Sequence, residues 1–504
     1  MEESKPVHLL EIRGQDLVPE KVAEVAYGRS GVFIADAARQ RMEASFSLVK
    51  SILASGKPTY GISTGFGDLS RVTISESQNY ELQRNLIRSH ASGVGRPFPK
   101  EVVRAMMVLR LNALCVGYSG INPQLADLLA SLINEDIIPV IPQQGSLGAS
   151  GDLAYLAHMS LVLMGEGQAE LDGRKMGGKE ALASRGLKPL QLYGKDGLAL
   201  INGTAGMLAL GVLALLEAEN CLNAANAAAA LTFEALRGFR DAYDPGIHTL
   251  RHQPGQMTVA SALLSMLEGS LLADSRTEDV QDAYTLRCVP QVHGASLDAI
   301  GYVRGVLSRE INAVTDNPIV FSETGRVLSG GNFHGQPLAL ALDFLAIAVS
   351  ELANISERRT ERMVNPQLSN GLPAFLCCQG GVQSGFMIPQ YVAASLVSEN
   401  KILAHPASVD SIPSSANKED HVSMGAAAGR KAARVVENTS RVIAIELICA
   451  AQAVDLLEPG KLGQGTGKLY RQIRRHVAGL TEDRPLSEDI ETMAELVRSG
   501  GLLV

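Results

Sequence analysis

The segment at residues 145–153 holds the residue types with the most unusual chemical potential. It reads Gly-Ser-Leu-Gly-Ala-Ser-Gly-Asp-Leu, a run of small residues that leads into a stretch of helix formers. On composition alone, a Gly/Ser loop with Asp152 capping the following helix accounts for it. A second interpretation is chemical: in a tight turn, the Gly151 nitrogen can attack the Ala149 carbonyl, which only small residues permit. Loss of water from that ring and of the Ser150 hydroxyl would leave a methylidene-imidazolone, an electrophilic carbon that no ordinary side chain supplies.

Other segments resemble known catalytic or binding motifs but lack residues that those motifs need. The glycine-rich run at 463–468 looks like a phosphate loop, but Leu462 stands where it should open and Leu469 replaces the magnesium-binding hydroxyl. Asp152 occupies the position where a nucleophile elbow needs its second glycine. The ten histidines form no HExxH pair, and no Cys/His group has zinc spacing, so the sequence indicates no catalytic metal.

Five further blocks accompany the Ala149-Ser150-Gly151-Asp152 segment. They are Tyr-Gly-Ile-Ser-Thr-Gly-Phe-Gly at 60–67, Leu-Ile-Asn-Gly-Thr at 200–204, Val-Gln-Asp-Ala-Tyr-Thr-Leu-Arg at 280–287, Ser-Gly-Gly-Asn-Phe-His at 329–334 and Ser-Ala-Asn-Lys-Glu-Asp-His-Val-Ser-Met at 415–424. In this order the blocks resemble the histidine and aromatic amino acid ammonia-lyase family, whose members depend on a methylidene-imidazolone. The similarity extends from about residue 60 to residue 457.

The resemblance implies catalytic roles for several residues. It makes Ala149, Ser150 and Gly151 the source of 4-methylidene-imidazole-5-one, with no external cofactor, and Tyr60 the base that removes the β-proton. A phenol must be deprotonated to act as a base, so the pocket would have to lower the pKa of Tyr60. The competing interpretation of Tyr60 is a turn residue that packs beside Phe66.

The resemblance also implies binding roles. Asn202 and Tyr284 would hold the cyclised group and its developing charge, and Gln281 and Phe333 would line the pocket. Arg287 would bind the substrate carboxylate, for which a planar guanidinium is well suited. Helical spacing would place 281, 284 and 287 on roughly one face. A surface salt bridge for Arg287 and an Asn-Gly turn for Asn202 are the alternatives.

Substrate choice depends on His90 and Glu419. The Ser89-His90 pair resembles the histidine-specific branch, and a carboxylate at 419 can hydrogen-bond an imidazole ring but would stay unpaired against a phenyl ring. Met387 would line the ring pocket, although a methionine is more often core filler. The alternatives are a satisfied half-buried histidine at 90 and a surface or helix-end carboxylate at 419.

Three residues depart from the family's usual pattern. Tyr155 stands where proline is common, Ser63 replaces a common asparagine, and Lys418 replaces a common glutamine. Lys418 bears most on substrate choice, because a neighbouring cation could pair with Glu419 and weaken imidazole recognition.

The function expected from this resemblance is elimination of ammonia from L-histidine to give trans-urocanate, the first step of histidine degradation. The expected enzyme is a carbon–nitrogen lyase and a homotetramer whose active sites are shared between subunits. The alternatives are a tyrosine or phenylalanine ammonia-lyase or an aminomutase of the same family, a catalytically silent lyase-related scaffold, and a serine hydrolase that uses Ser150.

The elements that must position these residues are mainly α-helices. Good helix formers, with Ala and Leu dominant, fill residues 207–236, 338–354 and 426–457. Before about residue 200 the apolar runs are shorter and separated by Gly and Pro. We therefore expect an N-terminal region at 1–218 that carries the tyrosine and cofactor loops, and a long-helix bundle at 219–504. The resemblance implies a fumarase/aspartase-like architecture.

Composition narrows the partners and the compartment. The net charge of −8 leaves no basic field for nucleic acid. The N-terminus, with Glu2, Glu3 and Glu11, has no secretory pattern, and the apolar stretches at 204–216 and 337–349 are short for a bilayer, so no membrane association is expected. The six cysteines have no CxxC spacing, which favours reduced cysteines in the cytoplasm.

Overall fold

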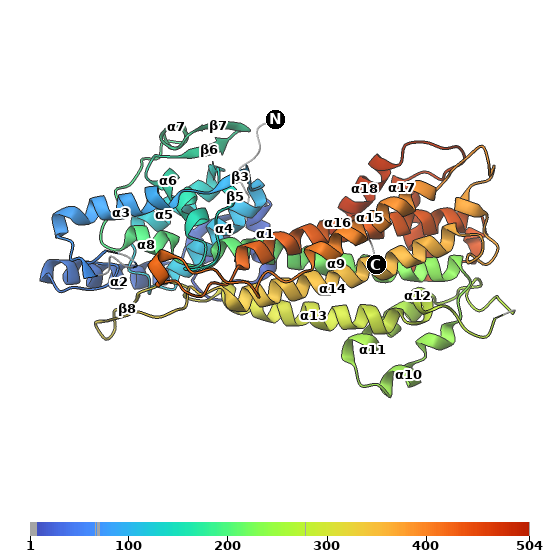
Figure 1. Cartoon of the computed structure of the whole chain (residues 1–504). Coiled ribbons are helices and arrows are strands. Elements are labelled where there is room, and N and C mark those ends of the chain that lie inside the picture. The colour runs from blue at the N-terminus through green and yellow to red at the C-terminus, as the bar shows by residue number, and fades with distance from the viewer. Residues whose placement is uncertain (1–7, 66, 68–70, 278, 503–504) are drawn as a thin grey trace. The chain divides into compact units, whose positions relative to one another are not determined.

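The computed structural model describes residues 8–65, 67, 71–277 and 279–502, so Glu2, Glu3 and Phe66 lie outside the described residues. The chain forms two compact units (Figure 1). Unit 1 comprises Met1–Leu213, Gly305–Leu342 and Pro406–Arg430, and unit 2 comprises Ala214–Arg304, Asp343–His405 and Lys431–Val504. The predicted boundary at 218/219 divides the chain into two consecutive stretches. Each unit instead combines three separate stretches, because the long helices cross from one unit to the other.

Helices dominate unit 1, and the mainly α class expected from the sequence is confirmed. Its helices are α1 (Pro19–Ala26), α2 (Asp36–Ser55), α3 (Glu76–His90), α4 (Lys100–Cys115), α5 (Pro123–Asn134), α6 (Leu153–Leu163), α7 (Gly178–Ser184), α8 (Asp196–Ile201) and the 3₁₀ turn η4 (Ser415–Asn417). Helix α4 is buried along almost its whole length, which makes it the centre of the unit.

The strands of unit 1 are short and form small separate sheets. They are β1 (Leu9–Ile12) parallel to β2 (Gly31–Ile34), β3 (Val94–Pro97) antiparallel to β5 (Pro142–Gln144), β4 (Ile138–Pro139), β6 (Gln168–Leu171) and β7 (Arg174–Gly177) in one antiparallel sheet, and the hairpin β8 (Ile319–Phe321) and β9 (Arg326–Leu328). Strand β5 ends one residue before the 145–153 segment, and α6 begins at its last residue, so this segment joins a strand to a helix.

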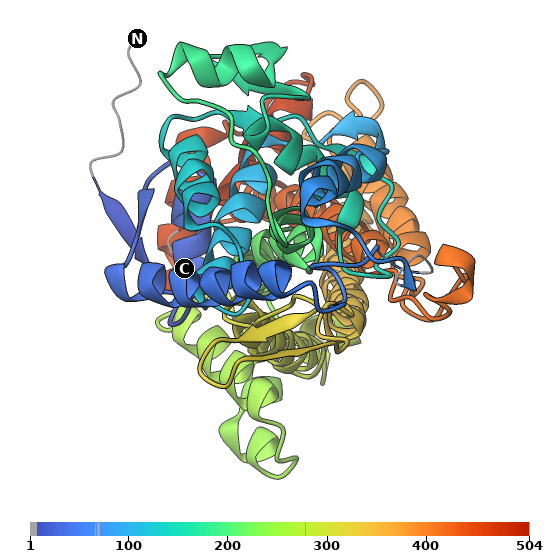
Figure 2. The same cartoon turned by 90° about the vertical axis from the view of Figure 1, so that its left-hand side faces the viewer.

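Hairpin β8–β9 packs beside α2, as Figure 2 shows in yellow and dark blue. Val49 and Leu53 of α2 form a buried cluster with Val320 of β8 and with Ile62. Because burial of apolar side chains is favourable, this cluster fixes the position of Ile62. It therefore anchors the loop that carries Tyr60, two residues earlier.

The long helices α9 (Ala205–Ala235), α13 (Val289–Ile311), α14 (Gln336–Val364) and α16 (Gly425–Asp455) contribute residues to both units. Three of them match the Ala- and Leu-rich stretches expected to be helical. Helix α14 ends one residue before the Asn365-Pro366 pair, because the residue before a proline is disfavoured in the α conformation.

Within unit 2 these helices pack around a buried ion pair. Arg359 of α14 donates two hydrogen bonds to Glu446 of α16, at 2.6 and 2.9 Å, and Thr232 of α9 donates a third at 2.8 Å. Both charged side chains are fully buried. Such a pair costs much desolvation energy, which these three hydrogen bonds to the carboxylate offset in part.

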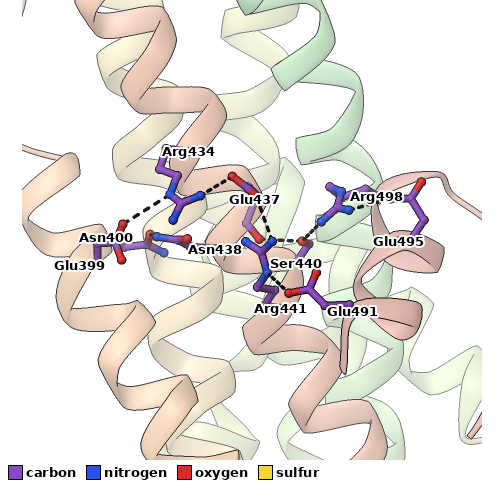
Figure 3. Close-up of polar contacts among 10 residues, drawn as sticks. All are labelled: Glu399, Asn400, Arg434, Glu437, Asn438, Ser440, Arg441, Glu491, Glu495 and Arg498. Atoms are coloured by element: carbon purple, nitrogen blue, oxygen red, sulfur yellow. Dashed lines mark hydrogen bonds and ion pairs between the residues drawn. The ribbon is translucent and has the colours of Figure 1, made fainter. Parts of the chain in front are cut away.

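The other helices of unit 2 are α10 (Pro245–Thr249), α11 (Pro254–Met266), α12 (Tyr284–Arg287), α15 (Met387–Leu403), α17 (Gln464–His476), α18 (Ser487–Arg498), and the 3₁₀ turns η2 (Arg240–Tyr243), η3 (Ala374–Leu376) and η5 (Pro459–Lys461). Figure 3 shows how arginines tie α15, α16 and α18 together. Arg441 of α16, for example, pairs with Glu437 on its own helix and with Glu491 of α18. These more exposed pairs each contribute little to stability.

Helices α9 and α14 are long and apolar enough to meet a length and composition test for membrane spans. Both helices are longer than the apolar stretches at 204–216 and 337–349 that the sequence analysis identified. However, 78% and 67% of their most apolar windows are buried inside the protein, as expected for core helices.

Candidate active site

The backbone of the 145–153 segment is held in a tight, left-handed turn. Gly148 and Gly151 have φ values of +74° and +73°. A Cβ added at Gly151 would lie 2.1 Å from the Gly203 carbonyl oxygen, and one at Gly148 would lie 2.2 Å from the Ser423 hydroxyl. Only glycine fits at either position, for steric as well as conformational reasons. Two of the small residues noted in the sequence, Gly148 and Gly151, are therefore required by the structure.

Asp152 anchors the end of this turn, but it does not cap helix α6 as composition suggested. Its backbone NH donates to the Gly203 carbonyl at 2.8 Å. One carboxylate oxygen accepts from the Ser146 hydroxyl at 3.0 Å, and the other accepts from the Met207 NH at 2.7 Å, in the first turn of α9. Burial raises the pKa of Asp152 to about 6, and these hydrogen bonds oppose the rise. The helix that Asp152 caps is thus one brought beside it by tertiary folding.

A second segment, residues 414–425, holds the other side of the turn. The Met424 NH donates to the Leu147 carbonyl at 3.0 Å, and the buried Ser423 hydroxyl donates to the Gly148 carbonyl at 3.2 Å. The turn is therefore fixed from both sides, by α9 and by this segment.

Glu419, in the same segment, contacts the serine of the turn. The Ser150 hydroxyl donates to Glu419 Oε1 at 2.9 Å, and the Ser414 hydroxyl donates to Oε2 at 3.0 Å. The backbone of Ser414 and Glu419 forms an antiparallel bridge that fixes the carboxylate. The sequence assigned Glu419 to the substrate ring but did not predict its contact with Ser150.

Ser150 and Glu419 face a cavity of about 380 Å³ within unit 1. Several predicted site residues line it, namely Tyr60, His90, Ser150, Asn202 and Glu419. The structure thus brings together residues that are far apart in the sequence. The volume of the cavity is in the range found for small-molecule binding sites.

His90 ends helix α3 with a defined tautomer. Its Nδ1 lies 2.8 Å from the Leu86 carbonyl oxygen, which can only accept, so Nδ1 carries the proton. Burial lowers the pKa of His90, while Leu86 and the nearby Glu419 carboxylate oppose the change. At neutral pH the ring is therefore uncharged, and Nε2 is a hydrogen-bond acceptor.

The electrostatics of Tyr60 differ from what its expected role requires. Desolvation raises the pKa of its phenol, the Glu419 carboxylate raises it further, and a hydrogen bond with the Gly67 backbone acts in the opposite direction. The groups of unit 1 alone thus favour the neutral phenol. A nearby cation, or further hydrogen bonds donated to the phenolate, would lower its pKa.

Asn202 follows helix α8 and is buried at the cavity wall. Within the described parts of the chain its side-chain oxygen has no hydrogen-bond partner. A buried unsatisfied acceptor is costly and calls for a partner that is added later. The cyclised group formed from Ala149, Ser150 and Gly151 has no N–H to donate to this oxygen, so the observation that fits the group is the tight turn that Gly151 makes possible.

The remaining predicted residues lie elsewhere. Phe333 is half-buried in the turn before α14 in unit 1 and is not among the residues described as lining the cavity. Gln281, Tyr284, Arg287 and Met387 belong to unit 2.

The 281–287 segment is organised without a continuous helix. Only 284–287 are helical, as α12, yet the Arg287 guanidinium donates to Gln281 Oε1 at 2.9 Å and stacks on the Tyr284 ring at 4.6 Å. Tyr284 is 70% exposed. These three groups form one surface cluster, the Arg287 cluster.

The three departures from the family pattern have clear surroundings. Ser63 closes the loop before Tyr60, because its hydroxyl accepts from the Thr59 NH at 2.9 Å and donates to the Lys57 carbonyl at 2.7 Å. Lys418 is exposed, whereas the adjacent Glu419 carboxylate accepts from two serines.

Tyr155 is fully buried. Its hydroxyl donates to the Gln143 carbonyl at 2.5 Å and accepts from Arg430 at 2.7 Å, and its ring meets Phe98 edge to face. It therefore connects the start of α6 to α16 within unit 1.

Sequence reasoning missed Ser146, Ser414 and Gly203, which hold Asp152, Glu419 and the 149–152 turn respectively. Each partner is distant in the chain or lies within a loop of small polar residues. Isolated serines and glycines carry no periodic signal, so only the fold reveals them.

The chain is similar to known proteins over almost its whole length. A curated relative, the histidine ammonia-lyase of Treponema denticola, is 59% identical over 96% of this chain and 96% of its own. The crystal structure of histidine ammonia-lyase from Trypanosoma cruzi is 43% identical, with a TM-score of 0.92 and coverage of 98% of this chain and 94% of that one. Tyrosine aminomutase from Streptomyces globisporus is 37% identical, with a TM-score of 0.93 and coverage of 98% and 97%. The family model described as aromatic amino acid lyase matches residues 17–475, and the chain belongs to that family.

Proposed function

We propose that this protein eliminates ammonia from L-histidine to give trans-urocanate. The observation that carries the proposal is the cavity in which Ser150 lies beside both His90 and Glu419. The name of the Treponema denticola relative supports histidine as the substrate.

The electrophile in this proposal is a methylidene-imidazolone formed from Ala149, Ser150 and Gly151. It supplies an electron sink for the substrate amine, which makes the β-proton easier to remove. The surrounding chain then has three tasks: to hold the imidazole, to take the proton and to bind the carboxylate.

Imidazole recognition falls to His90 and Glu419. His90 Nε2 accepts a hydrogen bond, because Nδ1 already donates to Leu86. The Glu419 carboxylate offers a second acceptor. An imidazole N–H can donate a hydrogen bond to one of these acceptors, whereas a phenyl ring has no N–H to donate. Leaving both groups desolvated and unpaired would penalise phenylalanine.

Proton removal falls to Tyr60, whose pKa a nearby cation would lower. Arg287 is the candidate for that cation and for the partner of the substrate carboxylate, with Gln281, Tyr284, Met387 and Phe333 completing the pocket. Because Gln281 and Tyr284 are exposed in this chain, we place the Arg287 cluster against the cavity of another copy, in a cytoplasmic homotetramer with shared sites.

The test uses purified protein with L-histidine, L-tyrosine and L-phenylalanine in separate assays. Ammonia and the near-ultraviolet absorbance of a conjugated product are followed together. We expect activity on histidine and a loss of about 10⁶-fold in Ser150→Ala, at the lower end of enzymatic rate enhancements. Preference for tyrosine or phenylalanine would overturn the roles of His90 and Glu419.

An aminomutase is the second candidate, since the Streptomyces globisporus tyrosine aminomutase shares the fold. Chromatography of the same reactions distinguishes the two outcomes. A β-amino acid accumulating in place of the conjugated acid would favour the mutase.

A further inference from the structure

Glu419 accepts a hydrogen bond from the hydroxyl that must leave if Ser150 is to become part of an electrophile. We propose that Glu419 is the proton carrier for the dehydration of Ser150, a maturation role that precedes its role toward substrate. This inference rests on the proposed function, because it concerns how the electrophile of that reaction forms. Its physical basis is the 2.9 Å contact between Ser150 Oγ and Glu419 Oε1.

The chemical step balances without any added reagent. The Cα–H bond of Ser150 breaks, and its electron pair forms the double bond between Cα and Cβ. The Cβ–Oγ bond breaks, and Oγ leaves as water. Glu419 returns to Oγ a proton equivalent to the one lost from Cα, so the chain loses one water and Glu419 is unchanged. A hydroxyl is a poor leaving group unless it is protonated, which is the task of a positioned acid.

The other nearby carboxylate is engaged elsewhere. Asp152 uses one oxygen to accept from Ser146 and the other to accept from Met207, and it is fully buried. Its contacts hold the end of the backbone turn that contains Ala149 and Gly151. The two acids thus have separate tasks: Asp152 holds the ring-closing backbone, and Glu419 meets the leaving hydroxyl.

The backbone before Glu419 is strained in a way that suits this task. Ser415, Ala416 and Asn417 all have positive φ, at 50°, 53° and 63°. Consecutive non-glycine residues in this region are uncommon and persist only where their surroundings enforce them. Here the bridge between Ser414 and Glu419 closes the turn, and Ser414 holds the second carboxylate oxygen.

The experiment measures the mass of the intact protein. A fully matured chain weighs less than its sequence by two waters, one from ring closure and one from Ser150. Wild type, Glu419→Gln and Lys418→Gln are isolated after brief expression and followed over time by mass spectrometry. Peptide fragmentation then shows whether the hydroxyl at Ser150 remains.

We expect Glu419→Gln to keep the Ser150 hydroxyl, with loss of that water slowed about 100-fold, a typical contribution of general acid–base catalysis. Glutamine preserves size and one acceptor but cannot carry the proton. Glu419→Asp should recover part of the rate, and Lys418→Gln should mature as wild type does. Loss of both waters at the wild-type rate in Glu419→Gln would overturn the inference.

Circular dichroism checks that each variant is folded. If Glu419→Gln is not, Ser414→Ala decides: it frees one carboxylate oxygen and should slow the loss of the Ser150 water several-fold, and an unchanged rate would overturn the inference. Wild-type protein that loses two waters but leaves histidine intact would refute the proposed substrate only. Wild-type protein at full mass would refute the electrophile and this inference together.

Discussion

The cavity around Ser150 in unit 1 and the Arg287 cluster in unit 2 are built in opposite ways. The predicted site residues of the cavity, Tyr60, His90, Ser150, Asn202 and Glu419, are half-buried or buried, and Ser150, Glu419 and His90 each have a hydrogen-bond partner in the same unit. The Arg287 cluster stands at the surface, with Tyr284 70% and its neighbour Val280 98% exposed. Contacts from distant parts of unit 1 thus hold the first set, whereas the contacts described for the second include those of Arg287 with Gln281 and Tyr284.

Electrostatics sharpen this contrast. Desolvation in the cavity favours the uncharged forms of His90 and Tyr60, because it lowers the pKa of the first and raises that of the second. The cavity by itself therefore disfavours the phenolate form of Tyr60. The electrostatic interactions of exposed polar groups, such as those of the Arg287 cluster, strengthen when an interface removes these groups from water. If the cavity of one copy met the Arg287 cluster of another, the interface would desolvate the cluster, and the guanidinium would lower the pKa of Tyr60.

Mixing two impaired variants gives the largest expected effect. Ser150→Ala should be nearly inactive alone, and Arg287→Met should retain roughly 1% of the wild-type rate at histidine concentrations well below KM. If each site takes Ser150 from one copy and Arg287 from another, randomly mixed oligomers should recover activity in about a quarter of their sites. The measurement is histidine deamination after co-expression of equal amounts, with each variant alone as control. No recovery in verified mixed oligomers would place both residues in one copy.

Arg287→Met alone should lower kcat/KM for histidine roughly 100-fold, which corresponds to about 3 kcal/mol for loss of a buried charged partner. Most of the change should appear in KM, because the lost contact is to the substrate carboxylate. Steady-state kinetics provide the measurement, with Arg240→Met, at a partly exposed ion pair in unit 2, as the control. A full effect on kcat at constant KM would argue against carboxylate binding.

The pH profile tests whether Arg287 also acts on Tyr60. A base must lose its proton, so kcat/KM rises with pH through the pKa of Tyr60, which burial raises. A guanidinium from another copy would lower that pKa. Arg287→Met should therefore move the rising limb upward by about one pH unit, whereas Arg287→Lys should keep it in place. An unchanged limb in Arg287→Met would mean that another group activates the phenol.

His90→Leu should lower kcat/KM for histidine about tenfold, because the imidazole loses one acceptor. Activity on phenylalanine, relative to histidine, should rise in the same variant. His252→Leu, at an exposed histidine in unit 2, is the matched control. Equal losses for both substrates would indicate that His90 supports the fold of the cavity and not the choice of ring.

Tyr155→Phe should have the smallest effect, a loss of about 1 kcal/mol in the free energy of unfolding. It removes the hydroxyl that bonds Gln143 and Arg430 but keeps the ring against Phe98. Urea unfolding at fixed protein concentration measures it, since oligomers are concentration-dependent. A much larger loss accompanied by lost activity would show that this contact also positions α6 and the loop before it.

Much of this molecule was predictable from its sequence. Ala- and Leu-rich stretches predicted α9, α14 and α16, and the small residues at 145–153 predicted a loop that could accommodate a tight turn. The helical spacing of 281, 284 and 287 correctly suggested that they meet, although Gln281 precedes α12 and its contact with Arg287 depends on side-chain reach. The cap formed by Asp152 was assigned to the wrong helix, because local rules favour the helix that follows directly.

What the sequence alone determined is local: which segments are helical, and where only glycine allows the backbone to turn. These properties depend on residues within a few positions of each other. Tertiary structure decided which groups meet: Asp152 with Met207, and Ser150 with Glu419, 269 positions away. Such contacts arise from packing whole helices and loops together, and the residue types at either end carry no mark of their partner. The run of small residues in the loop was therefore visible in the sequence and its chemistry was implied by the family resemblance, whereas the acid placed beside its serine became visible only in the fold.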